Sequence, residues 1–237
     1  MLIYLDVETT GLEPEDRICA IGMIGVEGEE TTVRCDLVKP PRKIRPEAMA
    51  LHHITNEMVR EKPLFAESAS FRWLEARNSS ENILVGHNIP FDLRMLQKEG
   101  FIWQGGVVDT LKCTRQLIPE CDQYGLQYLR YELGLYRDEE AEAKGLGIDL
   151  RAHHALGDAF QVKRLYDYLA ETADLQRLLE LTVERALMTK FAFGKYRGHH
   201  IEEIAMSDPG YLQWMLKTMF DMDEDLRYSV EYYLRMA

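Results

Sequence analysis

Residues 4–12 of the chain, YLDVETTGL, place two acidic side chains at the end of an apolar run that is typical of a buried strand. Asp6 and Glu8 are two residues apart, so on a strand their side chains leave the same face, close enough to share one cation. Burying an ionised carboxylate without a partner costs several kcal/mol, because the charge loses its water. A solvated strand end that begins the Thr-Thr-Gly turn would also explain the pair.

The segments around this stretch predict an α/β fold. Three short apolar runs open the chain as a meander of strands, at residues 2–7, 17–26 and 31–38. Strand and helix patterns then alternate, which is typical of a mixed sheet flanked by helices. The further predicted elements are a helix over 66–77, a strand over 81–88, a helix over 90–99 with Asn88 as its N-cap and Gly100 as its stop, a strand over 105–110 and a helix over 125–135.

The length of 237 residues predicts one full domain with a smaller one attached. The first domain is expected to span residues 1–172, with a charged, glycine-containing loop over 137–151 and a closing helix over 153–172. An amphipathic stretch over 173–186 is expected to form a helical linker. Residues 187–237 hold enough aromatic side chains for a small α-rich C-terminal domain.

The composition excludes some classes of protein. A net charge of −12 argues against tracking nucleic acid through many lysine–phosphate contacts, but not against gripping one strand end, because bound divalent cations invert the local field. The N-terminus lacks a signal-peptide pattern, and no window approaches about 20 apolar residues, so we expect a cytoplasmic protein without a membrane partner. The cysteines form no CxxC pair, which is typical of reduced thiols without a chemical role: Cys19, Cys35, Cys113 and Cys121.

Two more acids and one histidine lie where a site at the strand ends would need them. Asp92 falls in the first turn of a helix that follows a strand, although an acid there also complements the helix dipole. Asp158 shares an otherwise apolar helix face with Ala155 and Val162, where an unpaired charge would be costly. His153 lies at the start of the same helix, and an imidazole with a pKa of about 6.5 can accept a proton from water at neutral pH.

The set of donors indicates the kind of metal. Four carboxylates and one imidazole suit hard, oxygen-seeking cations, so Mg²⁺ or Mn²⁺ is expected rather than zinc, which favours histidine and cysteine. Two such ions about 3.5–4 Å apart are a known arrangement for cleaving phosphodiesters by in-line displacement. The sequence therefore predicts a two-ion site that acts on a phosphodiester.

Three short motifs together resemble a known family. DVETTGL, HNIPFD and HHALGD occur in this order and resemble the three exonuclease motifs of the DEDDh group of 3′→5′ exonucleases, whose members share an RNase H-like fold. This resemblance covers nearly all of residues 1–170. The ending, residues 187–217, resembles the C-terminal segment of the bacterial exodeoxyribonuclease X family. The resemblance therefore extends over the whole chain.

The resemblance implies a role for each of the five matched residues. Asp6, Glu8 and Asp158 would hold the first ion and the attacking water. Asp6 and Asp92 would hold the second ion, which stabilises the leaving 3′ oxygen. His153 would deprotonate the attacking water.

The residues expected to bind the terminal nucleotide follow the same motifs. His52 matches a histidine that often lies near the substrate in these enzymes, and a solvated loop histidine is the alternative. Asn88 and Phe91 are similarly placed, but a helix cap and a core residue are equally good interpretations of them. The turn after the two acids is placed to meet the 3′-OH and the last base: Thr9, Thr10, Gly11 and Leu12.

These expectations combine into a metal-dependent 3′→5′ exonuclease that removes nucleotides from single-stranded DNA ends and releases nucleoside 5′-monophosphates, with DNA repair as the setting. An exoribonuclease is the close alternative, because no residue reports a contact with a 2′-OH. The other alternative is a proofreading or scaffold protein that binds a polymerase or repair complex through its tail. A scaffold without activity would be expected to have lost an acid or the histidine.

The aromatic and basic stretch FAFGKYRG, residues 191–198, has two interpretations. Its side chains could stack on and grip single-stranded nucleic acid. Alternatively, Phe191, Phe193 and Tyr196 build a small core while Lys195 and Arg197 are solvated. The tail could also carry a protein partner or a dimer contact.

Overall fold

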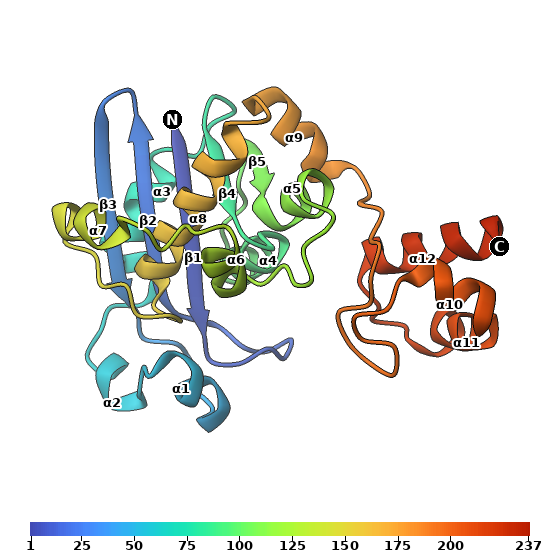
Figure 1. Cartoon of the computed structure of the whole chain (residues 1–237). Coiled ribbons are helices and arrows are strands. Elements are labelled where there is room, and N and C mark those ends of the chain that lie inside the picture. Colours follow the sequence, from blue (N-terminus) through green and yellow to red (C-terminus); the bar gives the residue numbers. More distant parts are fainter.

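A five-stranded mixed sheet forms the centre of the computed structural model, which describes residues 1–237 (Figure 1). The order across the sheet is β3-β2-β1-β4-β5, with β1–β2 and β2–β3 antiparallel and β1–β4 and β4–β5 parallel. The predicted α/β architecture is therefore confirmed. The strands are β1 (Leu2–Thr9), β2 (Ile18–Glu27), β3 (Glu30–Leu37), β4 (Ile83–Gly86) and β5 (Gly106–Asp109).

Helices cover both faces of the sheet. Alternate residues of each strand point to opposite sides, so each face carries apolar side chains that a layer of helices buries. Ile3, Leu5 and Val7 of β1 pack with α3 (Ala69–Glu75) and α4 (Pro90–Lys98). A short 3-10 helix, Phe65–Glu67, contributes Phe65 to this core. The helices on the other face are α5 (Thr110–Leu117), α6 (Leu126–Glu132), α7 (Glu139–Leu146), α8 (Ala155–Ala170) and α9 (Leu175–Val183).

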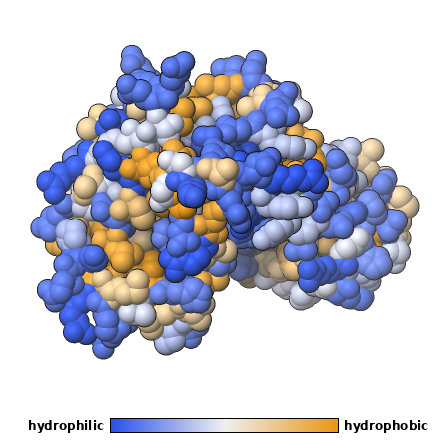
Figure 2. Space-filling view, turned by 60° about the vertical axis from the view of Figure 1, so that its left-hand side comes forward, coloured by the Kyte–Doolittle hydropathy of each residue, from blue (hydrophilic) through white to orange (hydrophobic).

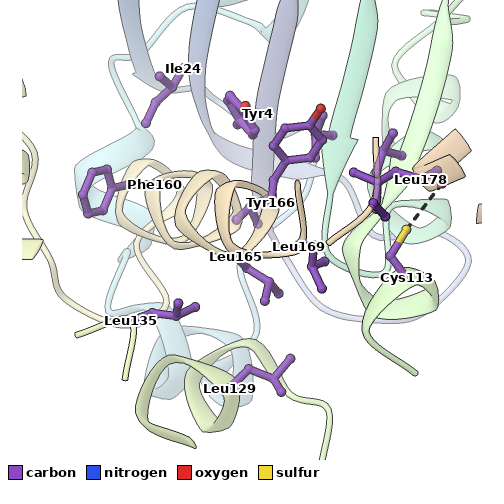
Figure 3. Close-up of a cluster of buried hydrophobic side chains, with 14 of the residues drawn as sticks. Tyr4, Ile24, Cys113, Leu129, Leu135, Phe160, Leu165, Tyr166, Leu169 and Leu178 are labelled. Atoms are coloured by element: carbon purple, nitrogen blue, oxygen red, sulfur yellow. Dashed lines mark hydrogen bonds between the residues drawn. The ribbon is translucent and has the colours of Figure 1, made fainter. Parts of the chain in front are cut away.

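The second core is built around α8, which lies along the sheet (Figure 3). Figure 3 shows Phe160, Leu165 and Leu169 of this helix among side chains from the sheet and from neighbouring helices. Tyr4 of β1 meets Tyr166 edge to face, with ring centroids 5.5 Å apart. Because α8 is fixed against β1 and β2, its N-terminal turn is held near the end of β1.

Two short helices, α1 (Pro46–His52) and α2 (Asn56–Val59), lie beyond the C-terminal end of β1 (Figure 1). They follow the proline-containing segment after β3. Ile44 and Asn56 hold this region together, since the Ile44 N–H donates to Asn56 Oδ1 at 2.9 Å and Asn56 Nδ2 donates to the Ile44 carbonyl at 3.2 Å.

The last 50 or so residues form a small helical unit with a core of its own. It contains α10 (Ile201–Ser207), α11 (Pro209–Thr218) and α12 (Glu224–Met236), which Figure 1 shows at one side of the sheet domain. In Figure 2 hydrophilic residues cover most of the surface in view, and apolar residues appear in separate patches. Lys112 Nζ and Arg115 Nη1 of α5 donate to the buried Asp225 carboxylate at 2.5 and 2.8 Å, which ties the two parts together.

The FAFGKYRG stretch divides between core and surface. Phe191 is buried in the small core and Tyr196 packs partly against it, whereas Phe193 is 44% exposed. Lys195 Nζ donates to Asp208 at 3.1 Å. No helix of the chain is both long enough and apolar enough to cross a membrane.

Two local predictions are wrong. Asn88 is not the N-cap of α4: it adopts φ 62°, its N–H donates to Asp109 Oδ1 at 2.9 Å, and Ile89 takes the cap position before Pro90. The charged segment 137–151 is not all loop, because it contains α7 (Glu139–Leu146). Glu139 of this helix is buried and forms an ion pair with Arg130. The local sequence does not reveal this partner.

The segment expected as a helical linker is helical over α9 and packs as part of the first core. Leu178 and Leu181 of α9 are buried in the same cluster as Val108 of β5 and Leu169 of α8. The chain crosses to the small helical unit only after α9 (Figure 1).

This packing predicts where the chain can be shortened. A chain that ends at residue 172 should lose about 3–6 kcal/mol of stability, because removal of α9 uncovers the core that Leu178 and Leu181 bury. A chain that ends at residue 186 should keep a cooperative transition close to that of the full chain. Thermal unfolding followed by circular dichroism measures the difference. Equal melting temperatures for the two truncations would contradict the prediction.

Candidate active site

Asp6 and Glu8 both face α8, on the side of the sheet that carries Tyr4. The pairing of β1 with β2 shifts register between Glu8 and Thr9, so the strand is irregular directly after the second acid. Bulges of this kind occur at sheet ends and re-aim side chains. The two carboxylates therefore project from a rigid strand into the space in front of the N-terminus of α8.

Asp158 reaches the same space because α8 approaches β2 very closely. Gly22 of β2 pairs with Asp6, and a Cβ atom on Gly22 would lie 2.2 Å from the Leu156 nitrogen. Any side chain at this position would push α8 away from the sheet. The missing side chain thus lets the first turn of α8 deliver Asp158 beside Asp6 and Glu8.

Asp6, Glu8 and Asp158 each offer a carboxylate oxygen, and these oxygens all lie within 4.8 Å of one another. Glu8 and Asp158 are buried, and no Lys or Arg forms an ion pair with any of the three. Like charges at this separation repel strongly when they are partly removed from water. An all-oxygen donor set without a cationic partner fits a hard divalent cation.

Asp92 lies beside this group but is held by the backbone. The β1–β4 ladder ends at the pair Tyr4–Val85, so the Val7 N–H has no partner on β4 and donates to Asp92 Oδ1 at 3.1 Å. Asp92 is buried in the first turn of α4 and lies outside the three-residue group. Its charge nevertheless acts on Asp6, where it raises the pKa more than Asp158 or Glu8 does.

Burial is the main reason that all four carboxyl groups have raised pKa values. Burial and the nearby Asp158 and Asp92 raise the pKa of Glu8 to about 8. Burial raises the pKa of Asp92 to about 8, against two backbone hydrogen bonds that lower it. Burial and the other three acids hold the pKa of Asp6 well above its usual range. Without a cation, this site resists full ionisation at neutral pH.

These pKa values predict how metal and pH affect stability. Glu8 and Asp92 have ordinary pKa values of 4.5 and 3.8, so between these values and about 8 the metal-free native state binds protons that the unfolded chain has lost. Stability therefore falls as pH rises across this window. Mg²⁺ at about 100 times its Kd should add about 2.7 kcal/mol at pH 8.5, or roughly 5–10 °C, and the same concentration much less at pH 5.5. Differential scanning fluorimetry with Mg²⁺ or EDTA tests this; a larger metal effect at pH 5.5 would contradict it.

His153 is exposed directly before α8, in the left-handed conformation with φ 55°. This conformation is unfavourable for a residue with a side chain and is found mainly where the surroundings require it. The histidine is close enough to lower the pKa of Asp158, an effect second only to that of burial. A solvent-facing imidazole therefore stands next to the acidic group.

A cavity of about 360 Å³ opens beside Glu8. Leu12 is 83% exposed at its edge, and α1 forms the opposite wall. The size is in the usual range of small-ligand sites. Of the residues expected to bind the terminal nucleotide, the cavity is lined by Thr9, Gly11, Leu12, His52 and Phe91.

Two of the residues expected at the terminal nucleotide do not line this cavity. The Thr10 side chain is fully buried and donates to Asp16 Oδ1 at 2.7 Å, so it shapes the turn from inside. Asn88 lines a different cavity, next to Lys112 and Arg115. The motifs do not reveal these two arrangements. The Thr10 partner Asp16 lies outside the motif that contains Thr10, and Asn88 has a left-handed backbone and a partner 21 residues away.

His52 has both ring nitrogens engaged by the backbone. The Ile54 N–H donates to Nδ1 at 3.0 Å, so Nε2 carries the proton and donates to the Thr9 carbonyl at 3.1 Å. Burial lowers the pKa of His52, which favours this neutral form. The ring therefore fixes α1 against the turn that carries Leu12.

Gln127 was not identified from the sequence, yet it contacts the acidic group directly. Its Nε2 donates to Asp158 Oδ1 at 2.7 Å, and its Oε1 accepts from Arg130 Nη1 at 3.1 Å. A guanidinium can only donate, so Arg130 fixes which end of the amide faces Asp158. Arg130 is in turn paired with the buried Glu139. Gln127 stands at the start of α6, and nothing in the local sequence indicates its contact with Asp158, which is 31 residues away.

Replacing Gln127 with Leu should weaken metal binding rather than the fold. Ligand carboxylates are oriented by such partners, and loss of one typically costs about 10- to 100-fold in metal affinity. We expect the Mg²⁺ concentration at half-maximal activity to rise by this factor, while high Mg²⁺ restores most of the rate. Gln213→Leu, at an exposed position of α11, is the matched control. An unchanged Mg²⁺ requirement would contradict a positioning role for Gln127.

The fold and the acidic group together define a class of protein. The chain belongs to the exonuclease family, whose model matches residues 3–166. Residues 191–218 match the exodeoxyribonuclease X-like C-terminal family. The resemblance seen in the three motifs and in the tail is thereby confirmed, and the chain is an enzyme of the nuclease class.

Particular relatives support this assignment along the whole chain. The sequence is 32% identical to exodeoxyribonuclease 10 of Escherichia coli strain K12 over 240 residues, which cover 99% of each protein. It is also 32% identical to the DNA polymerase III subunit epsilon of Treponema pallidum strain Nichols over 166 residues, which cover 63% of this chain and 76% of that one. A solved structure of exonuclease X in complex with 5′ overhanging duplex DNA has 27% identity and a TM-score of 0.58, and covers 77% of this chain and 99% of that one.

Proposed function

We propose that the protein is a divalent-metal-dependent 3′→5′ exonuclease that removes single nucleotides from DNA 3′ ends, with single-stranded ends preferred. The observation that carries the proposal is the group of Asp6, Glu8 and Asp158 oxygens within 4.8 Å, without a cation from the protein. Membership of the exonuclease family supports the reaction class. The DNA substrate is supported by the likeness to exodeoxyribonuclease 10.

The positions of the acids support a role for each of them. Asp6, Glu8 and Asp158 would hold one Mg²⁺ or Mn²⁺ ion, and Asp6 with Asp92 would hold a second. Such ions, when bound, supply Lewis-acid activation of water and neutralise charge at the scissile phosphate. Gln127 would keep Asp158 oriented toward the cation through its 2.7 Å hydrogen bond.

The remaining residues would move the proton and hold the end of the strand. His153 would accept the proton of the attacking water at an imidazole nitrogen, and its exposure lets it return that proton to solvent. The water oxygen would bond to phosphorus as the bond between phosphorus and the 3′ oxygen of the preceding nucleotide breaks. The leaving oxygen takes a proton from solvent and becomes the new 3′-OH of the strand, and a nucleoside 5′-monophosphate is released. The terminal nucleotide would occupy the 360 Å³ cavity beside Glu8, with its base against Leu12 and Phe91.

The test is digestion of matched 5′-labelled oligonucleotides, resolved at single-nucleotide steps. Single-stranded DNA, single-stranded RNA and a duplex with a recessed 3′ end are each incubated with Mg²⁺, Mn²⁺ or EDTA. We expect a metal-dependent ladder on single-stranded DNA, slower removal from the recessed end and no ladder in EDTA. A ladder mainly on RNA would make the protein an exoribonuclease. The absence of any ladder would favour a scaffold or proofreading partner without its own activity.

A cytoplasmic location and a role in DNA repair are parts of this proposal, as is a separate C-terminal unit over residues 187–237. A protein partner or a dimer contact is proposed for the C-terminal unit, where Trp214 and Phe220 are 53% and 90% exposed. Light scattering of the wild type and of Trp214→Ala/Phe220→Ala tests the dimer. A monomeric wild type would exclude it.

A further inference from the structure

A basic segment lies within this acidic protein. Residues 39–62 contain six Lys or Arg and three Glu, whereas the whole chain carries a net charge of −12. The segment comprises the end of the β3–α1 connection, α1, α2 and the residues after them. Its basic members are Lys39, Arg42, Lys43, Arg45, Arg60 and Lys62.

Four of these basic side chains line a cavity of about 420 Å³ between the 39–43 segment and α2. Glu57 is the only acid in the lining, and it is exposed. The lining is otherwise made of prolines, one valine and Asn56. We call this the basic cavity; its cationic residues are Lys39, Arg42, Lys43 and Arg60.

Three of the four cations are available for a ligand. Lys39 and Lys43 are exposed and form no ion pair with any acid of the chain. Arg60 has only a 4.0 Å contact with the exposed Glu57, and exposed pairs of this kind contribute little. Arg42 differs, because it is paired with Glu15 and Asp16.

The walls of the basic cavity are held in place before any ligand arrives. The Lys39 N–H donates to the Pro63 carbonyl at 2.8 Å, and Pro40 is buried. Asn56 exchanges two hydrogen bonds with the backbone of Ile44. A preorganised backbone lowers the ordering cost of binding.

The basic cavity is a neighbour of the cavity beside Glu8. Arg45 lines the latter and its N–H donates to the Thr10 carbonyl at 3.1 Å, while Arg42, three residues earlier, lines the basic cavity. Even a fully extended chain spans only about 11 Å in three residues. A nucleic acid strand carries roughly one phosphate per 3.4 Å of duplex axis. The distance between Arg42 and Arg45 therefore corresponds to a few nucleotides at most.

We propose that the basic cavity binds the phosphodiester backbone of the strand being degraded, a few nucleotides on the 5′ side of the one in the active site. The chemistry is that of Lys and Arg with phosphate oxygens, which fixes position without reading sequence. The inference rests on the proposed function. It explains how a protein with net charge −12 holds a polyanion beyond the catalytic group.

The test compares Lys39→Gln/Lys43→Gln with a control of equal charge, Lys144→Gln/Lys217→Gln, at exposed positions without ion pairs. Binding of single-stranded DNA is measured by fluorescence anisotropy in EDTA, and KM by digestion of strands of 2, 4, 8 and 16 nucleotides. We expect KM and Kd for the long strands to rise roughly 10- to 30-fold near 0.1 M salt. The slope of log K against log salt should become shallower by about 1.4. The dinucleotide should be cleaved as by the wild type.

Two other outcomes overturn the proposal. Equal behaviour of the two variants on every length would show that the basic cavity does not touch the strand. A loss that is equal for the dinucleotide and the long strands would place the effect in the active site. A wild-type protein whose DNA binding depends on Lys39 and Lys43 in the expected way, but which makes no ladder, would contradict the proposed function alone.

Discussion

Replacing Asp6 with Asn is expected to lower the rate of 3′-end cleavage by about 10³-fold or more. Asp6 is the one acid assigned to both ions, and its neutral amide removes a charge that binds them. Metal ions contribute several kcal/mol to such reactions, and about 4 kcal/mol corresponds to roughly 10³ in rate. Single-turnover digestion of 5′-labelled single-stranded DNA in saturating Mg²⁺ measures the loss.

The same substitution should not weaken the fold. Burial and the nearby Asp92, Asp158 and Glu8 raise the pKa of Asp6, so the ionised carboxylate is unfavourable in the metal-free native state. Asn at this position should therefore leave the melting temperature in EDTA unchanged or raise it, and reduce the stabilisation by Mg²⁺. Asp221→Asn, an exposed acid without a hydrogen bond or ion pair, is the control. Substantial Mg²⁺-dependent cleavage by Asp6→Asn would refute the site.

Removal of the His153 imidazole is expected to lower kcat about 10²- to 10⁴-fold, the range of general base catalysis. The left-handed backbone at φ 55° guides the choice of variant. Gly and Asn adopt this conformation readily, whereas Ala would add strain. His153→Gly and His153→Asn should thus keep the melting temperature and the Mg²⁺ requirement while they lose turnover. Imidazole added to His153→Gly should restore part of the rate.

His53 provides a matched control for this experiment. It is also an exposed histidine in the left-handed conformation, with φ 61°, at the end of α1. His53→Asn should keep full activity. Equal losses for His53→Asn and His153→Asn, or an active His153→Gly without imidazole, would contradict the role of His153 as the base.

Much of the architecture could be predicted from the sequence because its signals are local. The apolar runs at the start of the chain became β1, β2 and β3, and the 3.6-residue spacing around Asp158 became α8. The acids two apart on β1 had to share a face, whatever the rest of the fold did. The motif order and the tail identified the exonuclease family before any coordinates.

Local rules failed where distant partners decide the structure. The charged segment after α6 looks solvated, but Glu139 finds Arg130 and Gln161, and a helix forms there. Asn is a common residue at N-caps, yet the Asn88 N–H donates to Asp109 and the residue adopts a left-handed backbone. In both cases a tertiary hydrogen bond outweighs a local preference that contributes only about 1 kcal/mol.

The residue types and their order in the chain set the chemistry that this protein carries: carboxylates on a strand and two helices, and an imidazole before the second of these helices. The tertiary structure brings three of the carboxylates together, because Gly22 lets α8 approach β2 closely enough to bring Asp158 to Asp6. It also decided which neighbours hold them, since Gln127 and the Val7 N–H reach Asp158 and Asp92 from far along the chain. The type of each residue determines its chemistry, and the packing of the chain determines which groups it contacts.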